Sequence, residues 1–184
     1  MSFVDGENLT IRAQEIAGDA EGIALVEGPR YMQDTFVWWP TLQATRALNS
    51  PTEITVPLQR HALRAYYYTS VVGNEEKIRR VEKGLFHIGF APKVFKRSKT
   101  RRSKAVDITL ATDMLGHAYR DNYDVVFLVA GDGDNVPLVE EVKRLGKVVY
   151  VCFFMGSGLN ENLMLPADTF FHIDDFSSTN GSST

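Results

Sequence analysis

The regular alternation of apolar runs with helical patterns from residue 63 onward constrains this chain more than any other feature. Short runs rich in aromatic and β-branched residues predict strands, and apolar residues that recur at helical spacing predict helices. In chain order the sequence predicts a strand at 63–71, a helix at 74–88, a strand at 91–98, a helix at 103–119, a strand at 124–130, a helix at 135–145 and a strand at 147–154. Alternating strands and helices form parallel βαβ units. We therefore expect an α/β fold, a three-layer α/β/α sandwich whose central sheet is mainly parallel.

The N-terminal third adds one short strand and a less regular segment. Phe3-Val4 is a brief apolar entry that ends at Asp5-Gly6. The helical pattern that follows it predicts Asn8 as the helix N-cap. Glycine and proline punctuate residues 17–62, which we interpret as an insertion or elaboration after the first strand.

The C-terminal part completes the predicted domain. A short helix at 159–165 and a last strand at 169–173 follow the regular region. The small polar residues 177–184 predict a flexible tail. We therefore expect a single domain that spans residues 1–176.

Length and composition are those of an ordinary globular domain. The 184 residues are 44% hydrophobic and 23% charged, and the formal net charge is −3. The one cysteine, Cys152, lies in an apolar run, so we expect it to be buried, and it allows neither an intramolecular disulfide nor a cysteine-based zinc site. The first residues carry no apolar leader, and no apolar stretch approaches the roughly 20 residues of a membrane helix. We expect a cytoplasmic protein with no membrane association.

Acidic side chains follow two of the predicted strands at the point where each strand ends. Asp5 follows the first strand, and Asp132 and Asp134 follow the most hydrophobic one. In open parallel sheets, ligands bind outside the carboxyl ends of the strands. The sequence therefore predicts that these acids converge on one edge of the sheet, and that Gly131 and Gly133 permit a tight turn around them.

Two further acids lie on the helix that leads into the strand at 124–130. Asp107 and Asp113 are six residues apart, so on an α-helix they point in roughly opposite directions and only one of them faces the site. Asp107 is nearer the helix N-terminus, and we predict that it belongs to the site. Asp113 is predicted to have a supporting or structural role.

A cluster of carboxylates at one sheet edge calls for a compensating charge. Two carboxylates about 4 Å apart repel by roughly 4 kcal/mol at an effective dielectric constant of about 20. A hard divalent cation removes this cost, and Mg²⁺ or Mn²⁺ suits carboxylate and water ligands. Such an ion can activate water and stabilise charge on a phosphodiester that is being hydrolysed. The histidines show no metal-ligand spacing.

Each of these acids also has a simpler interpretation. Asp132-Gly133-Asp134 has the composition of a plain turn, and Asp5-Gly6 that of a turn before a capped helix. Asp107 suits a solvated first helical turn, where the helix dipole favours an acid. We expect Glu7 to be exposed, and Asn8 either to cap the helix or to hold Asp5 or a metal-bound water.

A basic stretch leads directly into the helix that carries Asp107. It contains no acid, and its charged residues are Lys93, Lys96, Arg97, Lys99, Arg101, Arg102 and Lys104. Lysine and arginine in such a run predict contacts with a phosphate backbone, although a solvated basic loop has the same composition. Lys104 lies three residues before Asp107 and is predicted to face the site.

Three motifs in order resemble those of the NYN domain family, the LabA-like branch of the PIN-like nucleases. They are FVDGEN at 3–8, KAVDITLATD at 104–113 and VAGDGDNVPLV at 129–139. The resemblance implies a PIN-like fold and Mg²⁺- or Mn²⁺-dependent endoribonuclease activity. It implies that Asp5, Asp107, Asp132 and Asp134 carry the metal site. It places Asn8 and Lys104 beside them, and Asp113 and Asn135 are further candidates for supporting residues. RNA is the implied partner, with DNA left open, and a homodimer is a family-level expectation in which residues 17–62 are a candidate interface.

Other classes of protein use related motifs. A Toprim-type phosphotransfer domain also has Asp-x-Asp after a parallel strand, but it needs a glutamate at the end of its first strand. A haloacid-dehalogenase phosphatase needs Asp-x-Asp at the first strand. A dinucleotide-binding domain is disfavoured because Asp132 stands where pyrophosphate would approach and the third glycine is missing. A catalytically silent RNA-binding or oligomerisation module is the alternative from a different class.

Overall fold

The computed structural model describes residues 1–19, 36–37, 64–97, 104–154 and 159–173, with the side chains of 17–19 left aside. Most of the predicted elaboration at 17–62, and the predicted tail at 177–184, lie outside the described residues. The elements are, in order, β1 (Ser2–Asp5), α1 (Gly6–Asp19), β2 (Ala65–Val71), α3 (Glu75–His87), β3 (Ala91–Lys96), α4 (Lys104–Tyr119), β4 (Val125–Val129), a 3₁₀ turn (Gly133–Asn135), α5 (Val136–Arg144), β5 (Val148–Phe153), α6 (Glu161–Met164) and β6 (Thr169–His172).

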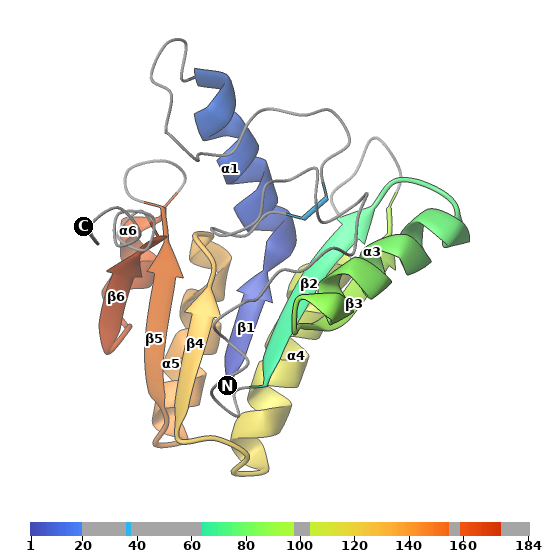
Figure 1. Cartoon of the computed structure of the whole chain (residues 1–184). Coiled ribbons are helices and arrows are strands. Elements are labelled where there is room, and N and C mark those ends of the chain that lie inside the picture. The colour runs from blue at the N-terminus through green and yellow to red at the C-terminus, as the bar shows by residue number, and fades with distance from the viewer. Residues whose placement is uncertain (20–35, 38–63, 98–103, 155–158, 174–184) are drawn as a thin grey trace, which may run out of the picture.

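The six strands form one parallel sheet in the order β3-β2-β1-β4-β5-β6 (Figure 1). From β1 the chain builds the sheet outward on one side through β2 and β3, and then on the other side through β4, β5 and β6. The direction in which successive strands are added to the sheet therefore reverses between β1 and β4. In open α/β sheets, a crevice forms at the carboxyl ends of the strands at such a reversal. The predicted α/β class with a parallel sheet is confirmed.

Helices cover both faces of the sheet and enclose two apolar cores. On one face α1 and α3 pack over a core that includes Val4, Tyr67 and Phe153. On the other face α4 and α5 pack over a core that includes Phe3 and Leu128 (Figure 1). Because successive side chains of a strand point to opposite faces, Phe3 and Val4 belong to different cores. The result is the predicted three-layer sandwich.

Local sequence signals set most element boundaries. Asn74 is the N-cap of α3, since its side chain accepts a hydrogen bond from the Lys77 N–H. Pro137 lies in the first turn of α5, where its missing N–H costs nothing. Gly146 ends the same helix with a positive φ of 77°. As predicted, β3 is an edge strand, and Cys152 is buried in the core.

The start of α1 differs from the prediction. The helix begins at Gly6 directly after β1, and Asp5 occupies the N-cap position. The Asn8 N–H donates to Asp5 Oδ1 at 3.0 Å, so the prediction that Asn8 is the N-cap is wrong. Glycine at position 6 lets the helix start directly against the Tyr67 ring, since a Cβ there would overlap that ring.

Of the helices in the described parts of the chain, none is both long and apolar enough to cross a membrane.

Replacing Gly6 with alanine tests this close packing. Because the added methyl group meets a fully buried aromatic ring, we expect Gly6→Ala to destabilise the protein by about 1–3 kcal/mol. The matched control is Gly116→Ala in α4, where the nearest atom is the end of the Arg120 side chain at 3.3 Å. Alanine there is expected to stabilise the helix by about 0.5–1 kcal/mol. Chemical denaturation measures both changes, and equal effects would contradict this account of Gly6.

Candidate active site

Asp5 is the most strongly perturbed carboxyl group of the described residues. It is the last residue of the central strand β1 and is only 4% exposed. Burial raises its pKa to about 7; the nearby negative charges of Asp107, Glu7 and Asp132 add to this increase, whereas the hydrogen bond from the Asn8 N–H opposes it. Asp107 and Asp132 therefore lie within electrostatic range of Asp5. Acids from α4 and from the loop after β4 thus act on the carboxyl group at the end of β1, and Asp134 is not among the charges that raise its pKa.

Asp132 stands in a compact loop just beyond β4. Its Oδ1 accepts a hydrogen bond from the Asp134 N–H at 3.4 Å and so caps the 3₁₀ turn. Asn135 closes the loop from the other side, because its backbone N–H and its Nδ2 both donate to the Asp132 carbonyl oxygen, at 3.2 and 3.3 Å. Gly131 lies against Phe153, whose ring fills the space that a Cβ would need. Asp132 is therefore held by hydrogen bonds within its own loop and by the packing of the adjacent Gly131 on β5.

Asn160 is part of this loop's environment, although its sequence context gave no sign of it. The Asn160 N–H donates to the Gly131 carbonyl oxygen at 2.9 Å, and its side-chain amide lies where a Cβ on Gly133 would be. Its Oδ1 also accepts from the Asn162 N–H and caps α6. Asn160 reaches the loop that carries Asp132 because α6 packs against the 3₁₀ turn. Asp134 itself is exposed in the middle of the turn.

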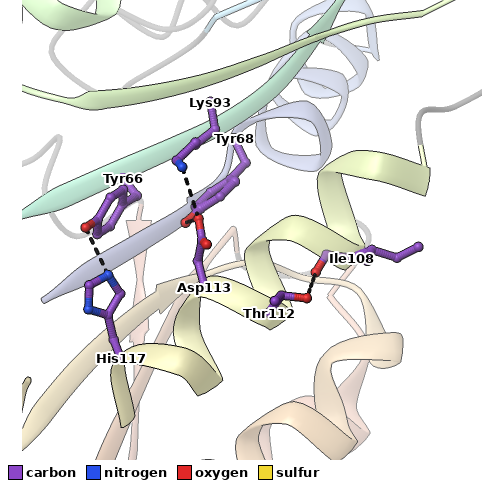
Figure 2. Close-up of polar contacts among 7 residues, drawn as sticks. All are labelled: Tyr66, Tyr68, Lys93, Ile108, Thr112, Asp113 and His117. Carbon is purple, nitrogen blue, oxygen red and sulfur yellow. Dashed lines mark hydrogen bonds and ion pairs between the residues drawn. The ribbon is translucent and has the colours of Figure 1, made fainter. Parts of the chain in front are cut away.

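Helix α4 presents its two acids to different surroundings. Asp107 is exposed in the first turn and acts electrostatically on Asp5. Figure 2 shows Asp113 turned toward the sheet, where its Oδ2 accepts a hydrogen bond from Tyr68 Oη at 3.0 Å and pairs with Lys93 Nζ at 3.5 Å. One turn further, His117 Nε2 lies 3.0 Å from Tyr66 Oη. Asp113 and His117 thus bind α4 to β2 and β3.

Glu7 is not where the sequence placed it. It was predicted to be exposed, but its side chain is buried in the first turn of α1. Its Oε1 lies 3.4 Å from Arg97 Nη1 in an ion pair between α1 and the end of β3. The prediction is wrong because an isolated helical first turn does not reveal that another strand end lies against it.

The basic stretch is described only at its two ends. Lys96 is exposed at the end of β3, and Arg97 follows it with its guanidinium directed to Glu7. Lys104 is exposed as the first residue of α4, one turn before Asp107. Lys99, Arg101 and Arg102 lie outside the described residues. The ends of the stretch therefore flank the candidate site at the same edge of the sheet.

The chemistry of these side chains fits a hard divalent cation. In the parts of the chain that the structure describes, no group of three or more histidine, cysteine or acidic side chains is arranged to hold a metal ion. The donors are nevertheless carboxylate oxygens, which Mg²⁺ and Mn²⁺ prefer. The negative charges that raise the Asp5 pKa are those that a cation offsets. Asn8 Oδ1 is a further buried acceptor, with no hydrogen-bond partner among the described residues.

The NYN domain family model matches residues 1–174, which is nearly the whole chain. This chain belongs to the NYN domain family. Members of that family are generally nuclease-like hydrolases of the PIN-like kind, and such nucleases generally depend on a divalent metal ion. A crystal structure of a protein of unknown function from Vibrio parahaemolyticus RIMD 2210633 is similar, with 28% identity, 61% of this chain and 70% of that chain covered, and a TM-score of 0.47. None of the curated proteins matches.

The raised Asp5 pKa predicts a pH dependence of stability in the absence of divalent ions. A carboxyl group whose folded pKa of about 7 exceeds its ordinary value of 3.8 binds protons more tightly in the folded state. It therefore contributes stability below the lower value, and this stability is lost as the pH rises through about 7. With a chelator present, we expect Asp5→Asn to lack the fall in unfolding free energy that Asp5 causes as the pH rises toward about 7. The amide oxygen of the variant still accepts the hydrogen bond from the Asn8 N–H. Denaturation at several pH values measures the effect, at about 1.4 kcal/mol for each unit of pKa shift.

The control for this experiment is Asp124→Asn, since the Asp124 side chain is fully exposed at the opposite end of β4. Mn²⁺ added at pH 8 should raise the melting temperature of the parent and of Asp124→Asn more than that of Asp5→Asn. Identical pH profiles for the parent and Asp5→Asn would contradict the assignment of the perturbed pKa.

Proposed function

We propose that this NYN-family protein is a Mg²⁺- or Mn²⁺-dependent endoribonuclease. The single observation that carries the proposal is the buried Asp5 carboxyl group at the β1–β4 reversal, with Asp107 and Asp132 close enough to raise its pKa. A fold that concentrates negative charge beside a buried carboxyl group is suited to a divalent cation. Family membership makes hydrolysis of a phosphodiester the reaction that such a site supports.

The four acids would divide the work of holding the ion. Asp5 is the rigid member, because burial and the Asn8 N–H hold its carboxyl group in place. Asp132 is positioned by its own loop, whereas Asp107 and Asp134 are exposed and approach from α4 and the 3₁₀ turn. A bound divalent ion would activate the attacking water and stabilise negative charge on the phosphate. No histidine is needed as a general base.

RNA is proposed as the substrate because basic side chains flank these acids. Lys96 and Lys104 are exposed at the two described ends of the basic stretch, and both stand at the carboxyl-end edge of the sheet. Positive charge there attracts a polyanionic strand toward a site that is otherwise acidic. We propose that Lys104, which is exposed one turn before Asp107, contacts the phosphate on which the reaction occurs.

A catalytically silent RNA-binding module is the second candidate. The observation that favours it is that the described carboxylates are not arranged as a ready-made group of three metal ligands. Such a module would bind RNA through the same basic stretch without cutting it. Cleavage assays with Mg²⁺ and Mn²⁺ on varied RNA and DNA substrates separate the two functions.

Asp132→Asn tests the proposed nuclease most directly. Removing this carboxylate is expected to lower Mn²⁺-dependent cleavage of total RNA by about 100-fold or more, because the ion loses a charged ligand. The matched control is Asp124→Asn, which changes an acid at the other end of the same strand and should cleave like the parent. Circular dichroism verifies that both variants are folded. An Asp132→Asn protein that cuts as fast as the parent would exclude this assignment.

The basic stretch is tested by Arg101→Gln combined with Arg102→Gln. If both arginines contact phosphates, RNA affinity should fall and the slope of log K against log salt should decrease by about 1.4, or about 0.7 for each contact. The control is Arg120→Gln combined with Arg144→Gln, which removes two arginines at the C-terminal ends of α4 and α5, away from the acids. Fluorescence anisotropy at several salt concentrations measures both. Equal slopes for the two double variants would contradict the proposed contacts.

A further inference from the structure

A second group of polar side chains lies beside the carboxylates, where α1 begins and β2 and β3 end. Of the six buried side-chain atoms without a hydrogen-bond partner in the described residues, four belong to this region: Glu7 Oε1, Asn8 Oδ1, Ser70 Oγ and Arg97 Nε. Glu7 Oε1 is offset by its ion pair with Arg97, which leaves Asn8 Oδ1, Ser70 Oγ and Arg97 Nε without a partner in the described residues. Buried polar atoms are nearly always hydrogen bonded, so their concentration in one place indicates a ligand position.

Arg97 reaches from the edge of the sheet toward its centre. Its N–H donates to the Val71 carbonyl oxygen at 3.0 Å, which continues the pairing of β3 with β2. Its Nη1 lies 3.4 Å from Glu7 Oε1, in the helix that starts directly after β1. Since β2 lies between β3 and β1, the arginine side chain spans the carboxyl end of β2. Its side chain is 25% exposed, so solvent and ligands have access to part of it.

Ser70 lies near the end of β2, on the α4 side of the sheet, one residue before the Val71 that pairs with the Arg97 backbone. Tyr68 and Ser70 point to the same face of β2 because side chains alternate along a strand, and Tyr68 belongs to the core beneath α4. Asp5 shares that face with Phe3 and is the register partner of Tyr68. Ser70 is therefore one pleat further toward the carboxyl edge of the sheet than Asp5. The residue is 2% exposed, and its hydroxyl is buried and unpaired among the described residues.

Glu7 supplies the support that orients the guanidinium. Its side chain is 9% exposed, and an acid so buried needs a cationic partner. The pairing occupies one part of a planar group that has five N–H donors in a fixed fork. The Arg97 Nε–H remains unpaired in the described residues, together with the Ser70 hydroxyl. Both are donors, and both belong to residues at the carboxyl ends of β2 and β3, the sheet edge at which Asp5 ends β1.

We propose that Arg97 and Ser70 form a phosphate-binding position for a nucleic-acid strand beside the carboxylate site, and that Glu7 is the positioning residue that holds Arg97. This inference rests on the proposed function, because it assigns a second phosphodiester of the same substrate. Phosphate oxygens accept strong, paired hydrogen bonds from a guanidinium. Asn8 Oδ1 is an acceptor and does not suit an anion, so it belongs with the cation-binding carboxylates.

Arg97 differs in kind from the exposed lysines at the two described ends of the basic stretch. Lys96 and Lys104 are exposed charges that attract any polyanion. Arg97, in contrast, is partly buried and held by an acid on another element, so its donors are directed before the strand arrives. A preorganised donor contributes to the register of the strand on the enzyme as well as to affinity.

The test measures binding of a short fluorescein-labelled oligouridylate with a chelator present, at several salt concentrations. Arg97→Gln should weaken binding about 10-fold and reduce the salt slope by about 0.7. Arg97→Lys should keep the slope but lose affinity, because lysine lacks the fork. Glu7→Gln should weaken binding about 3-fold without lowering the slope, since the arginine charge remains. Ser70→Ala should weaken it similarly, and the control Arg144→Gln, an exposed arginine paired with Glu141, should bind like the parent.

The outcomes separate this inference from the nuclease proposal. If the Arg97, Glu7 and Ser70 variants lose thermal stability but bind with the parent's affinity and slope, their role is structural and the phosphate position is wrong. If cleavage occurs in Mn²⁺ and Arg97→Gln changes neither binding nor KM, the nuclease proposal is supported and the phosphate-binding position is wrong. If binding depends on Arg97 as expected but no metal supports cleavage, the phosphate position stands and the nuclease falls. Should Arg97→Gln fail to fold, unchanged affinity in both Arg97→Lys and Ser70→Ala overturns the inference.

Discussion

The burial of the Asp5 carboxyl group at the centre of the sheet is the constraint on which the candidate site depends. β1 is flanked on both sides by parallel strands, so its last residue has little access to water. Ionising a carboxyl group there is costly, and the neighbouring acids increase the cost. The first turn of α1 offsets part of it through the Asn8 N–H. A divalent cation would offset much more, which is why this charge distribution is suited to metal binding.

Contacts on both sides of β1 keep the other acids in electrostatic range of Asp5. The loop after β4 is compact because Gly131 and Gly133 leave room for Phe153 and Asn160. Asp132 is held from within by its bonds to Asp134 and Asn135. On the far side of the reversal, α4 is bound to β2 and β3 through its second acid, while its first acid stays at the site. The same helix therefore carries one residue for structure and one for chemistry.

Much of this arrangement was predictable from local patterns. Alternating apolar runs and helical periods predicted β2 to β6 and the helices between them, and the six-residue spacing of Asp107 and Asp113 predicted that they face opposite ways. Three predictions about the β1–α1 junction were less successful. The helix starts three residues earlier than expected, Asp5 caps it in place of Asn8, and Glu7 is buried. A short strand followed at once by a helix leaves no periodic pattern from which to locate the boundary.

By itself, the sequence determined which segments are strands or helices and which acids stand at strand ends, because both depend on the spacing of residues close together in the chain. Only the tertiary structure decided that β1 lies between β2 and β4, that Arg97 crosses β2 to reach Glu7, and that Asn160 packs over Gly133. These contacts join residues far apart in the chain, and no local period encodes them. The acids could thus be named from the sequence, whereas the neighbours that bury one of them and orient the others follow from the order of the strands.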